Sequence, residues 1–189
     1  MNDDSFFGPF PVLNTSRLVL KQILEEDAEH LFQILSNPAV LQFCDLPLHQ
    51  NIPDSKKFIC EIDEGYKSKN QICWGIFQLS NNQLIGLCRF YNFNARHQFV
   101  SIGFELATEY WGGGLMKEAL TCAITYLFTG CHVNRIEAQV FTGNEKSVKL
   151  LEKIGFKKEG IMRQNFLIDG KLQDSLLYSI LQEDIIRRY

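Results

Sequence analysis

The sequence "EYWGGGLMKEAL", residues 109–120, is the strongest indication of how this chain folds. Three consecutive glycines stand directly before a run that otherwise predicts a helix, although glycine costs a helix interior about 1 kcal/mol relative to alanine. A strand predicted over 99–106 ends just before them. A strand, a glycine-rich turn and a helix in this order are typical of a phosphate site, because the first helical amides lack partners and the absent Cβ atoms let an anion approach.

Two common phosphate-binding patterns do not match this stretch. A P-loop requires GxxxxGK[ST], and Lys117 is followed here by Glu118. A dinucleotide fingerprint requires a small third residue at the position of Lys117, within a parallel unit at the start of the chain. The remaining alternative is a flexible loop whose glycines bind nothing.

Composition limits the class of protein. The chain has 189 residues, 46% of them hydrophobic and 22% charged, which fits one domain over 1–189 with a sizeable core. A net charge of −3 gives no basic footprint for nucleic acid. The acidic N-terminus and the lack of a run of about 18 apolar residues predict neither a signal peptide nor a membrane span. Six cysteines without a CxxC pair and four scattered histidines predict a cytoplasmic protein with reduced thiols and no metal.

Hydrophobic periodicity predicts a mixed order of strands and helices. Asp27 and Asp54 are the expected starts of two helices, and Asp169 with Gly170 is the expected turn of a closing hairpin. The pattern predicts an α/β (α+β) fold with one mixed, mostly antiparallel sheet of about seven strands flanked by helices. The predicted strands are 17–23, 72–79, 84–93, 99–106, 135–141 and the two arms of a hairpin within 165–181. A long helix is predicted after the glycines, with Leu115, Ala119, Ala123 and Leu127 on one stripe, and another over 144–156.

Three segments together resemble the GNAT acetyltransferases, and within them the ribosomal-protein-alanine N-acetyltransferase-like branch. They are "IGFELATEYWGGGLMKEAL", "NRIEAQVFTGNEKSVKLLEKIGFKKEGIMR" and "DGKLQDSLLYSIL", and the resemblance covers nearly the whole chain. The pyrophosphate motif of the family, Q/R-x-x-G-x-G/A, falls on residues 111–116. Trp111 replaces its first residue, Gly114 matches its first invariant glycine, and Met116 replaces its last small residue.

The resemblance implies a GNAT fold whose sheet splays between the fourth and fifth strands, with acetyl-CoA bound in the gap as co-substrate. The pantetheine arm would pair with the backbone of the first splayed strand, and the pyrophosphate would meet the amides of the glycine turn. Asn144 would contact the pantetheine, and Ser147 would donate a hydrogen bond to the departing thiolate. The implied cofactor-binding residues are Phe104, Leu106, Ala107, Trp111, Gly112, Gly113, Gly114, Leu115, Met116, Asn144 and Ser147.

The implied reaction is direct attack of a neutral amine on the thioester, without a metal. Glu105 is the candidate base and Ser147 the second candidate catalytic residue, since Glu105 stands alone in the apolar "IGFELA". Alternatives are a solvated or ion-paired Glu105 and an Asn144 that only caps its helix. The segment 127–177 holds no tyrosine, so a tyrosine beside the sulfur on that helix has no support.

The expected acceptor is the N-terminal α-amine of a protein or peptide. An α-amine costs about 1 kcal/mol to deprotonate at pH 7, whereas a lysine side chain costs about 4.6 kcal/mol. Alternatives are a small amine, such as a polyamine, amino acid or antibiotic, and an acyl-CoA-binding module without turnover. A homodimer is compatible with the resemblance, and neither nucleic acid nor membrane is an expected partner.

Overall fold

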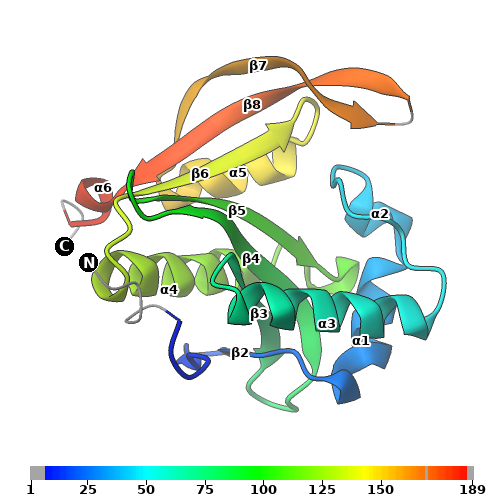
Figure 1. The fold of residues 1–189 in the computed structure, drawn as a ribbon. Coiled ribbons are helices and arrows are strands. Elements are labelled where there is room, and N and C mark those ends of the chain that lie inside the picture. Colours follow the sequence, from blue (N-terminus) through cyan, green and yellow to red (C-terminus); the bar gives the residue numbers. More distant parts are fainter. Residues whose placement is uncertain (1–6, 169, 187–189) are drawn as a thin grey trace.

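The computed structural model describes residues 7–168 and 170–186, and these form one mixed sheet of eight strands (Figure 1). The spatial order is β1-β2-β3-β4-β5-β6-β8-β7, and β5–β6 is the parallel pair, whereas the other neighbours are antiparallel. The strands are β1 (Leu13–Asn14), β2 (Leu18–Lys21), β3 (Gln71–Gln78), β4 (Leu84–Asn94), β5 (Phe99–Leu106), β6 (Arg135–Phe141), β7 (Lys157–Ile168) and β8 (Lys171–Leu181).

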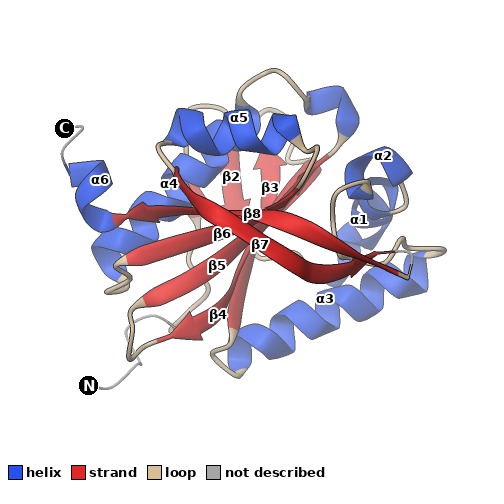
Figure 2. Cartoon of the chain, turned by 90° about the horizontal axis from the view of Figure 1, so that it is seen from above, coloured by secondary structure: helices blue, strands red, loops and turns tan. Residues whose placement is uncertain are grey.

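Helices cover both faces of the sheet, which separates the core into two layers (Figure 2). On one face, α1 and α3 pack against Phe77 and Leu87. On the other face, α4 and α5 pack against Trp74 and Ile136. The helices are α1 (Ala28–Leu35), α2 (Pro38–Leu41), α3 (Ile52–Lys67), α4 (Leu115–Gly130), α5 (Glu145–Ile154) and α6 (Gln182–Ile186), with short 3-10 turns η2 (Glu25–Asp27) and η3 (Thr108–Tyr110).

The predicted fold class is confirmed, and the differences lie at short elements and helix starts. The sheet has eight strands rather than about seven, because two residues of β1 add an edge to β2. The second helix begins at Ile52 rather than at Asp54: the Asn51 side chain accepts from the Asp54 amide, and Asp54 returns a bond in a capping box. Pro38 begins the single turn of α2, with Asn37 as its cap.

The predicted splay between β5 and β6 is confirmed by the register. The two strands pair only from Phe99 opposite Arg135 to Ile102 opposite Ala138, although both continue further. The amide of Ala107 donates to β4, so the odd-numbered residues of β5 direct their backbone groups there. The backbone groups of Phe104 therefore point into the gap that β6 leaves.

The closing hairpin is also confirmed. Ile168 pairs with Lys171, and Gly170 has the positive φ of +73° that favours glycine in such a turn, whereas Asp169 lies outside the described residues. A bulge between Met162 and Phe166 bends β7. In Figures 1 and 2 the far end of this hairpin and α2 project on the same side of the molecule.

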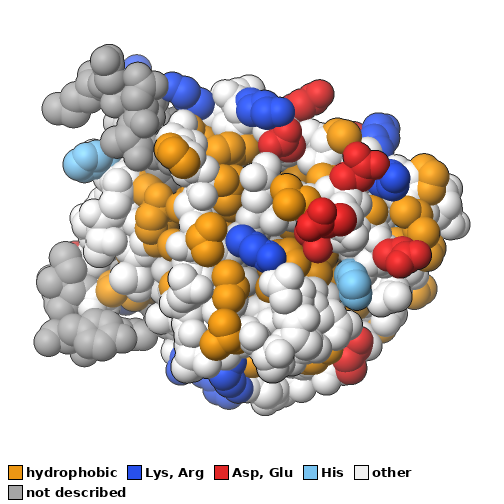
Figure 3. Space-filling model, turned by 90° about the horizontal axis from the view of Figure 1, so that it is seen from below, with side chains coloured by type: hydrophobic (Ala, Val, Ile, Leu, Met, Phe, Trp, Pro, Cys, Tyr) orange, Lys and Arg blue, Asp and Glu red, His pale blue; other side chains and the backbone are white. Residues whose placement is uncertain are grey.

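The underside of the molecule carries charged side chains of both signs interspersed with hydrophobic groups (Figure 3). Among the described residues, no helix combines the length and the apolar character that crossing a membrane requires.

Candidate active site

The glycine turn adopts a backbone conformation that other residues rarely tolerate. Gly112 has φ +80° and Gly114, the residue that precedes α4, has φ +76°. A Cβ atom added to Gly112 would meet no atom within 4 Å, and one added to Gly113 would meet only the Tyr110 carbonyl, at 3.9 Å. The turn therefore leaves its outer side open, as an anion that binds the amides requires.

Two helices begin side by side at the open end of the splay. Because β5 and β6 are parallel, the helices that follow them, α4 and α5, both begin at the same edge of the sheet (Figure 1). Helix N-termini carry partial positive charge and unpaired amides, so the two helix starts together offer backbone donors to an anion. The residues present therefore fit a phosphate-bearing group.

Asn144 and Ser147 lie at the start of α5. The Asn144 Oδ1 atom accepts a hydrogen bond from the Ser147 amide at 3.2 Å, so Asn144 caps the helix. This is the structural alternative for Asn144. The helix nevertheless places both residues directly after β6, the second strand of the splay.

Trp111 joins the end of β5 to the start of α5. Its Nε1–H donates to the Leu106 carbonyl at 2.8 Å, and the Lys146 ammonium lies 4.0 Å from the centre of its ring. Trp111 is 38% exposed. Since the Leu106 carbonyl is taken, the backbone groups left in the gap for an extended ligand are those of Phe104 and the Leu106 amide.

The glycine turn is tied to the N-terminal part of the chain by an ion pair. The Arg17 guanidinium lies 2.7 Å from Glu118 in the first turn of α4, and its Nη1 donates to the Gly113 carbonyl at 3.0 Å. Thr15 also donates to Glu118, at 2.6 Å. Burial raises the pKa of Glu118, but these hydrogen bonds outweigh it and hold the pKa below its usual value. Residues about a hundred positions apart carry no local pattern, so sequence reasoning missed this contact.

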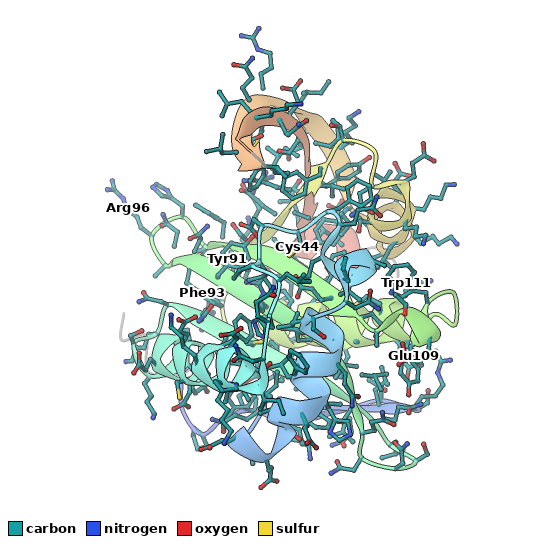
Figure 4. The ribbon with its side chains drawn as sticks, turned by 90° about the vertical axis from the view of Figure 1, so that its right-hand side faces the viewer. Cys44, Tyr91, Phe93, Arg96, Glu109 and Trp111 are labelled. Carbon is teal, nitrogen blue, oxygen red and sulfur yellow. The ribbon has the colours of Figure 1, made fainter. Side chains whose placement is uncertain are left out.

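Glu105 is 5% exposed and ion-paired, which is one of the alternatives considered for it. Its Oε1 atom lies 3.2 Å from Arg89 Nη2, and the Cys44 thiol donates to the same oxygen at 3.2 Å. Burial alone would lower the pKa of Arg89, but the charge of Glu105 and its neighbours raises it, so Arg89 stays protonated. In the view of Figure 4, Cys44 lies between Tyr91 and Trp111.

The sheet face that carries Glu105 also carries the unpaired polar atoms of the interior. Leu87, opposite Glu105, packs on the α1–α3 side, and the register continues this face through β6 to Phe141 and its partner Ser175 on β8. Asn165 on β7 contacts the same face, because its side-chain NH2 group donates to Gln139 Oε1 at 3.1 Å. Buried polar groups normally find partners, so their concentration indicates a surface for a polar ligand. In the described part of the chain, the buried side-chain nitrogen and oxygen atoms without a partner are Arg89 Nε, Glu105 Oε2, Asn165 Oδ1 and Ser175 Oγ.

The segment 42–51, between α2 and α3, borders the same region. A Cβ atom added to Gly143 would lie 3.7 Å from the Phe43 ring, which brings this segment against the turn that leads into α5. At the end of β6, the ring of Phe141 contacts the ring of Phe166 on β7, with centroids 4.5 Å apart. The gap in the sheet therefore lies between two helix N-termini and a face that carries aromatic and polar side chains.

A splayed parallel pair with two helix N-termini at its open end fits the acetyl-CoA site that the resemblance to the GNAT acetyltransferases implies. A model of the acetyltransferase (GNAT) domain matches residues 17–157, and the chain belongs to this family. The expected class, an acetyl-CoA-dependent N-acetyltransferase, is thereby confirmed.

Several known proteins are similar to this chain. The uncharacterized N-acetyltransferase YoaA of Bacillus subtilis (strain 168) is 36% identical over 173 residues, 92% of this chain and 98% of that protein. The ribosomal protein uS5-alanine N-acetyltransferase of Escherichia coli (strain K12) is 34% identical over 125 residues, 65% of this chain and 64% of that protein. A spermidine N(1)-acetyltransferase of Vibrio cholerae is 31% identical over 109 residues, 58% of this chain and 63% of that protein.

A solved structure supports the same fold. RimL, a ribosomal alpha-N-protein acetyltransferase solved in complex with coenzyme A, superposes with a TM-score of 0.82 at 20% identity, over 90% of this chain and 98% of that chain. At this identity the likeness concerns the fold.

Proposed function

We propose that this protein transfers the acetyl group of acetyl-CoA to the N-terminal α-amine of a protein or peptide. The observation that carries the proposal is the pair of helix N-termini, with the open glycine turn, at the splay of β5 and β6. When bound there, acetyl-CoA supplies an activated thioester. The chain has to hold that thioester still beside an amine, and such positioning contributes several kcal/mol to catalysis.

The donor would be held mainly by backbone groups. The amides of Gly112 to Met116 would meet the pyrophosphate, and Phe104 with the Leu106 amide would pair with the pantetheine arm. Trp111 would hold the turn against β5 through its bond to the Leu106 carbonyl. Ala107 is less well placed, because its amide donates to Ile85 at 2.9 Å.

Glu105 would bind the acceptor amine. Its Oε2 atom is buried and without a partner among the described residues, so it can accept an N–H of the attacking amine and take up its proton. Because the positive charge of Arg89 offsets the charge of the Glu105 carboxylate, Glu105 is suited to an amine that needs little assistance to lose its proton. An α-amine is such a group, because its pKa of about 7.7–8.0 leaves part of it neutral at pH 7.

Ser147 would act on the leaving side. It lies in the first turn of α5, where partial positive charge and its hydroxyl can both stabilise a departing thiolate. A thiol pKa of about 8.5 means that one weak donor suffices. Asn144 would then cap the helix through its Oδ1 atom, and its side-chain NH2 group would remain available to the pantetheine.

The compartment can be proposed from the cysteines. All six are free, and Cys73 and Cys88 are buried in the sheet. Burial raises the pKa of Cys73 to about 12, so this thiol is unreactive at neutral pH. Free thiols in this number support a reducing environment such as the cytoplasm.

Thermal unfolding with and without acetyl-CoA tests donor binding. At 100 times its dissociation constant a ligand stabilises the folded state by about 2.7 kcal/mol, which corresponds to roughly 5–10 °C for a chain of this size. We expect this shift with acetyl-CoA and a much smaller one with pantetheine, which lacks the phosphates. The absence of any shift at millimolar acetyl-CoA would overturn donor binding at the glycine turn.

A panel of acceptors tests the second half of the proposal. Mass spectrometry of the product would compare a peptide with a free α-amine, the same peptide blocked at its N-terminus but carrying a lysine, and spermidine. Acetylation of the free α-amine at the highest kcat/KM supports the proposal. Preference for spermidine would assign the enzyme to small amines, and binding without acetylation of any member would indicate a module without turnover.

A further inference from the structure

The Cys44 thiol is fixed from both sides. Its sulfur accepts a hydrogen bond from the Leu46 amide at 3.4 Å, and its S–H donates to Glu105 Oε1 at 3.2 Å. Burial, with Glu105 adding to it, raises the pKa of the Cys44 thiol well above the usual range. The thiol therefore stays protonated at neutral pH and acts as a hydrogen-bond donor.

Two donors converge on a single carboxylate oxygen. Arg89 Nη2 lies 3.2 Å from the Oε1 atom that the Cys44 thiol also reaches. Glu105 Oε2 is buried and has no partner among the described residues. An unpaired buried carboxylate oxygen is costly, so this arrangement indicates that a ligand group completes it.

We propose that Cys44 is a positioning residue for acetyl transfer: together with Arg89 it occupies Oε1 of Glu105 and so presents Oε2 to the acceptor amine. This inference rests on the proposed function, because it takes Glu105 as the group that meets the amine. Cys44 belongs to the segment 42–51, whose Phe43 ring lies beside the turn at Gly143. The position of that segment and the orientation of the carboxylate are therefore coupled.

A direct role for the thiol in chemistry is less consistent with its surroundings. A thiolate is the nucleophilic form of cysteine, and both burial and the neighbouring carboxylate disfavour it here. The S–H bond is also directed at Glu105 rather than into open space. Cys44 acts through Glu105.

The test compares two replacements that differ in their ability to donate. Cys44→Val cannot donate a hydrogen bond, whereas Cys44→Ser can. The control is Cys60→Ala, at an exposed cysteine on α3. Steady-state kinetics would use acetyl-CoA and the best acceptor of the panel, and melting temperatures would show which variants fold, with Cys44→Ala as a substitute if the valine variant does not.

We expect Cys44→Val to lower kcat about tenfold, the effect of losing roughly one hydrogen bond to a charged group, with KM for acetyl-CoA almost unchanged. Cys44→Ser should recover most of this loss, and Cys60→Ala should match the unaltered protein. A Cys44→Val variant with full kcat would overturn the inference and leave amine acetylation standing. An equal loss in Cys44→Ser would also overturn it, because packing rather than donation would then be responsible.

An infrared measurement separates this inference from the proposed function. The S–H stretch of Cys44, obtained as the difference between the unaltered protein and Cys44→Ser, reports the strength of its acceptor without any substrate. A band that shifts in Glu105→Gln supports the contact between Cys44 and Glu105. This result would stand even if no acceptor of the panel were acetylated, whereas the missing acetylation would overturn the proposed function. A band that does not respond overturns the inference.

Discussion

Arg17 and Glu118 lie 101 positions apart in the chain, yet they form a 2.7 Å ion pair at the start of α4. The same guanidinium donates to the Gly113 carbonyl, so one side chain holds both the helix and the turn that precedes it. Backbone amides can bind an anion only if the loop that carries them is fixed in place. This ion pair is therefore part of the proposed acetyl-CoA site, although neither side chain has to touch the ligand.

Replacing Arg17 with methionine should weaken acetyl-CoA binding about tenfold. The change releases the Gly113 carbonyl and leaves the Glu118 carboxylate without its cation beside the amides that would bind the pyrophosphate. Isothermal titration calorimetry gives the dissociation constant. The dissociation constant of Arg17→Lys should lie between those of Arg17→Met and the unaltered protein. Lysine keeps the positive charge but cannot bridge both Glu118 and the Gly113 carbonyl.

The matched control for this change is Lys56→Met. Lys56 also forms a 2.7 Å ion pair, with the exposed Glu25, but on α3, which packs on the sheet face opposite α4. Exposed pairs contribute little, so its removal should leave acetyl-CoA binding unchanged. Equal dissociation constants for Arg17→Met and the unaltered protein would show that the turn is held without Arg17.

The main strands and helices could be predicted because their signals are local. Periodicity gives 99–106 and 135–141 with the bounds that the structure has, and the glycine turn is visible as a run of three letters. The surroundings of Glu105 could not be predicted. Arg89 reaches it through the register of a neighbouring strand, and Cys44 through the position of a loop, and both are set only when the whole chain folds. Strand β1 and helix α2 were missed because two and four residues show no periodicity.

Alanine at Gly114 should destabilise the protein by about 1 kcal/mol, because a residue with a Cβ atom is strained at a φ of +76°. The nearest atom to that Cβ would be Arg17 Nη2 at 3.7 Å, an ordinary contact, so strain rather than collision causes the loss. Thermal unfolding should show a melting temperature lower by about 2–4 °C.

Gly113 supplies the internal comparison for this prediction. It belongs to the same turn but is not among the glycines with positive φ, and an added Cβ would have space. Gly113→Ala should therefore leave the melting temperature nearly unchanged. If both variants melted at the same temperature, the conformation of the turn would not be the reason for its glycines.

Lys146 should contribute to binding through the phosphates of the donor. Its ammonium lies over the Trp111 ring, next to the glycine turn, and is exposed. Lys146→Met should raise the dissociation constant of acetyl-CoA about threefold at low salt, and the difference should shrink as ionic strength rises. Lys149→Met, which removes a lysine paired with Glu145 on the same helix, is the control. A loss of affinity that is equal for acetyl-CoA and pantetheine would contradict a phosphate contact.

Glu159 should make stability depend on pH in the acid range. Hydrogen bonds from Arg135 and Ser179 lower its pKa from 4.5 to about 2. Because the folded state holds this carboxylate more tightly than the unfolded chain does, its stabilising effect is complete above about pH 4.5 and disappears as the pH falls toward about 2. The side chain is 38% exposed, so solvent screening limits the effect to about 1 kcal/mol or less.

Melting temperatures of the unaltered protein and of Glu159→Gln, measured from pH 7 down to pH 2, would check this dependence. The two proteins should differ by a few degrees at pH 7, and the difference should begin to close below about pH 4.5, where the unfolded chain binds the proton, and should vanish toward about pH 2. Glu25→Gln removes an exposed partner of Lys56 and should show a smaller difference throughout. A gap for Glu159→Gln that stayed constant to pH 2 would mean that the side chain stabilises β7 by its shape, and that its charge pairing with Arg135 contributes nothing.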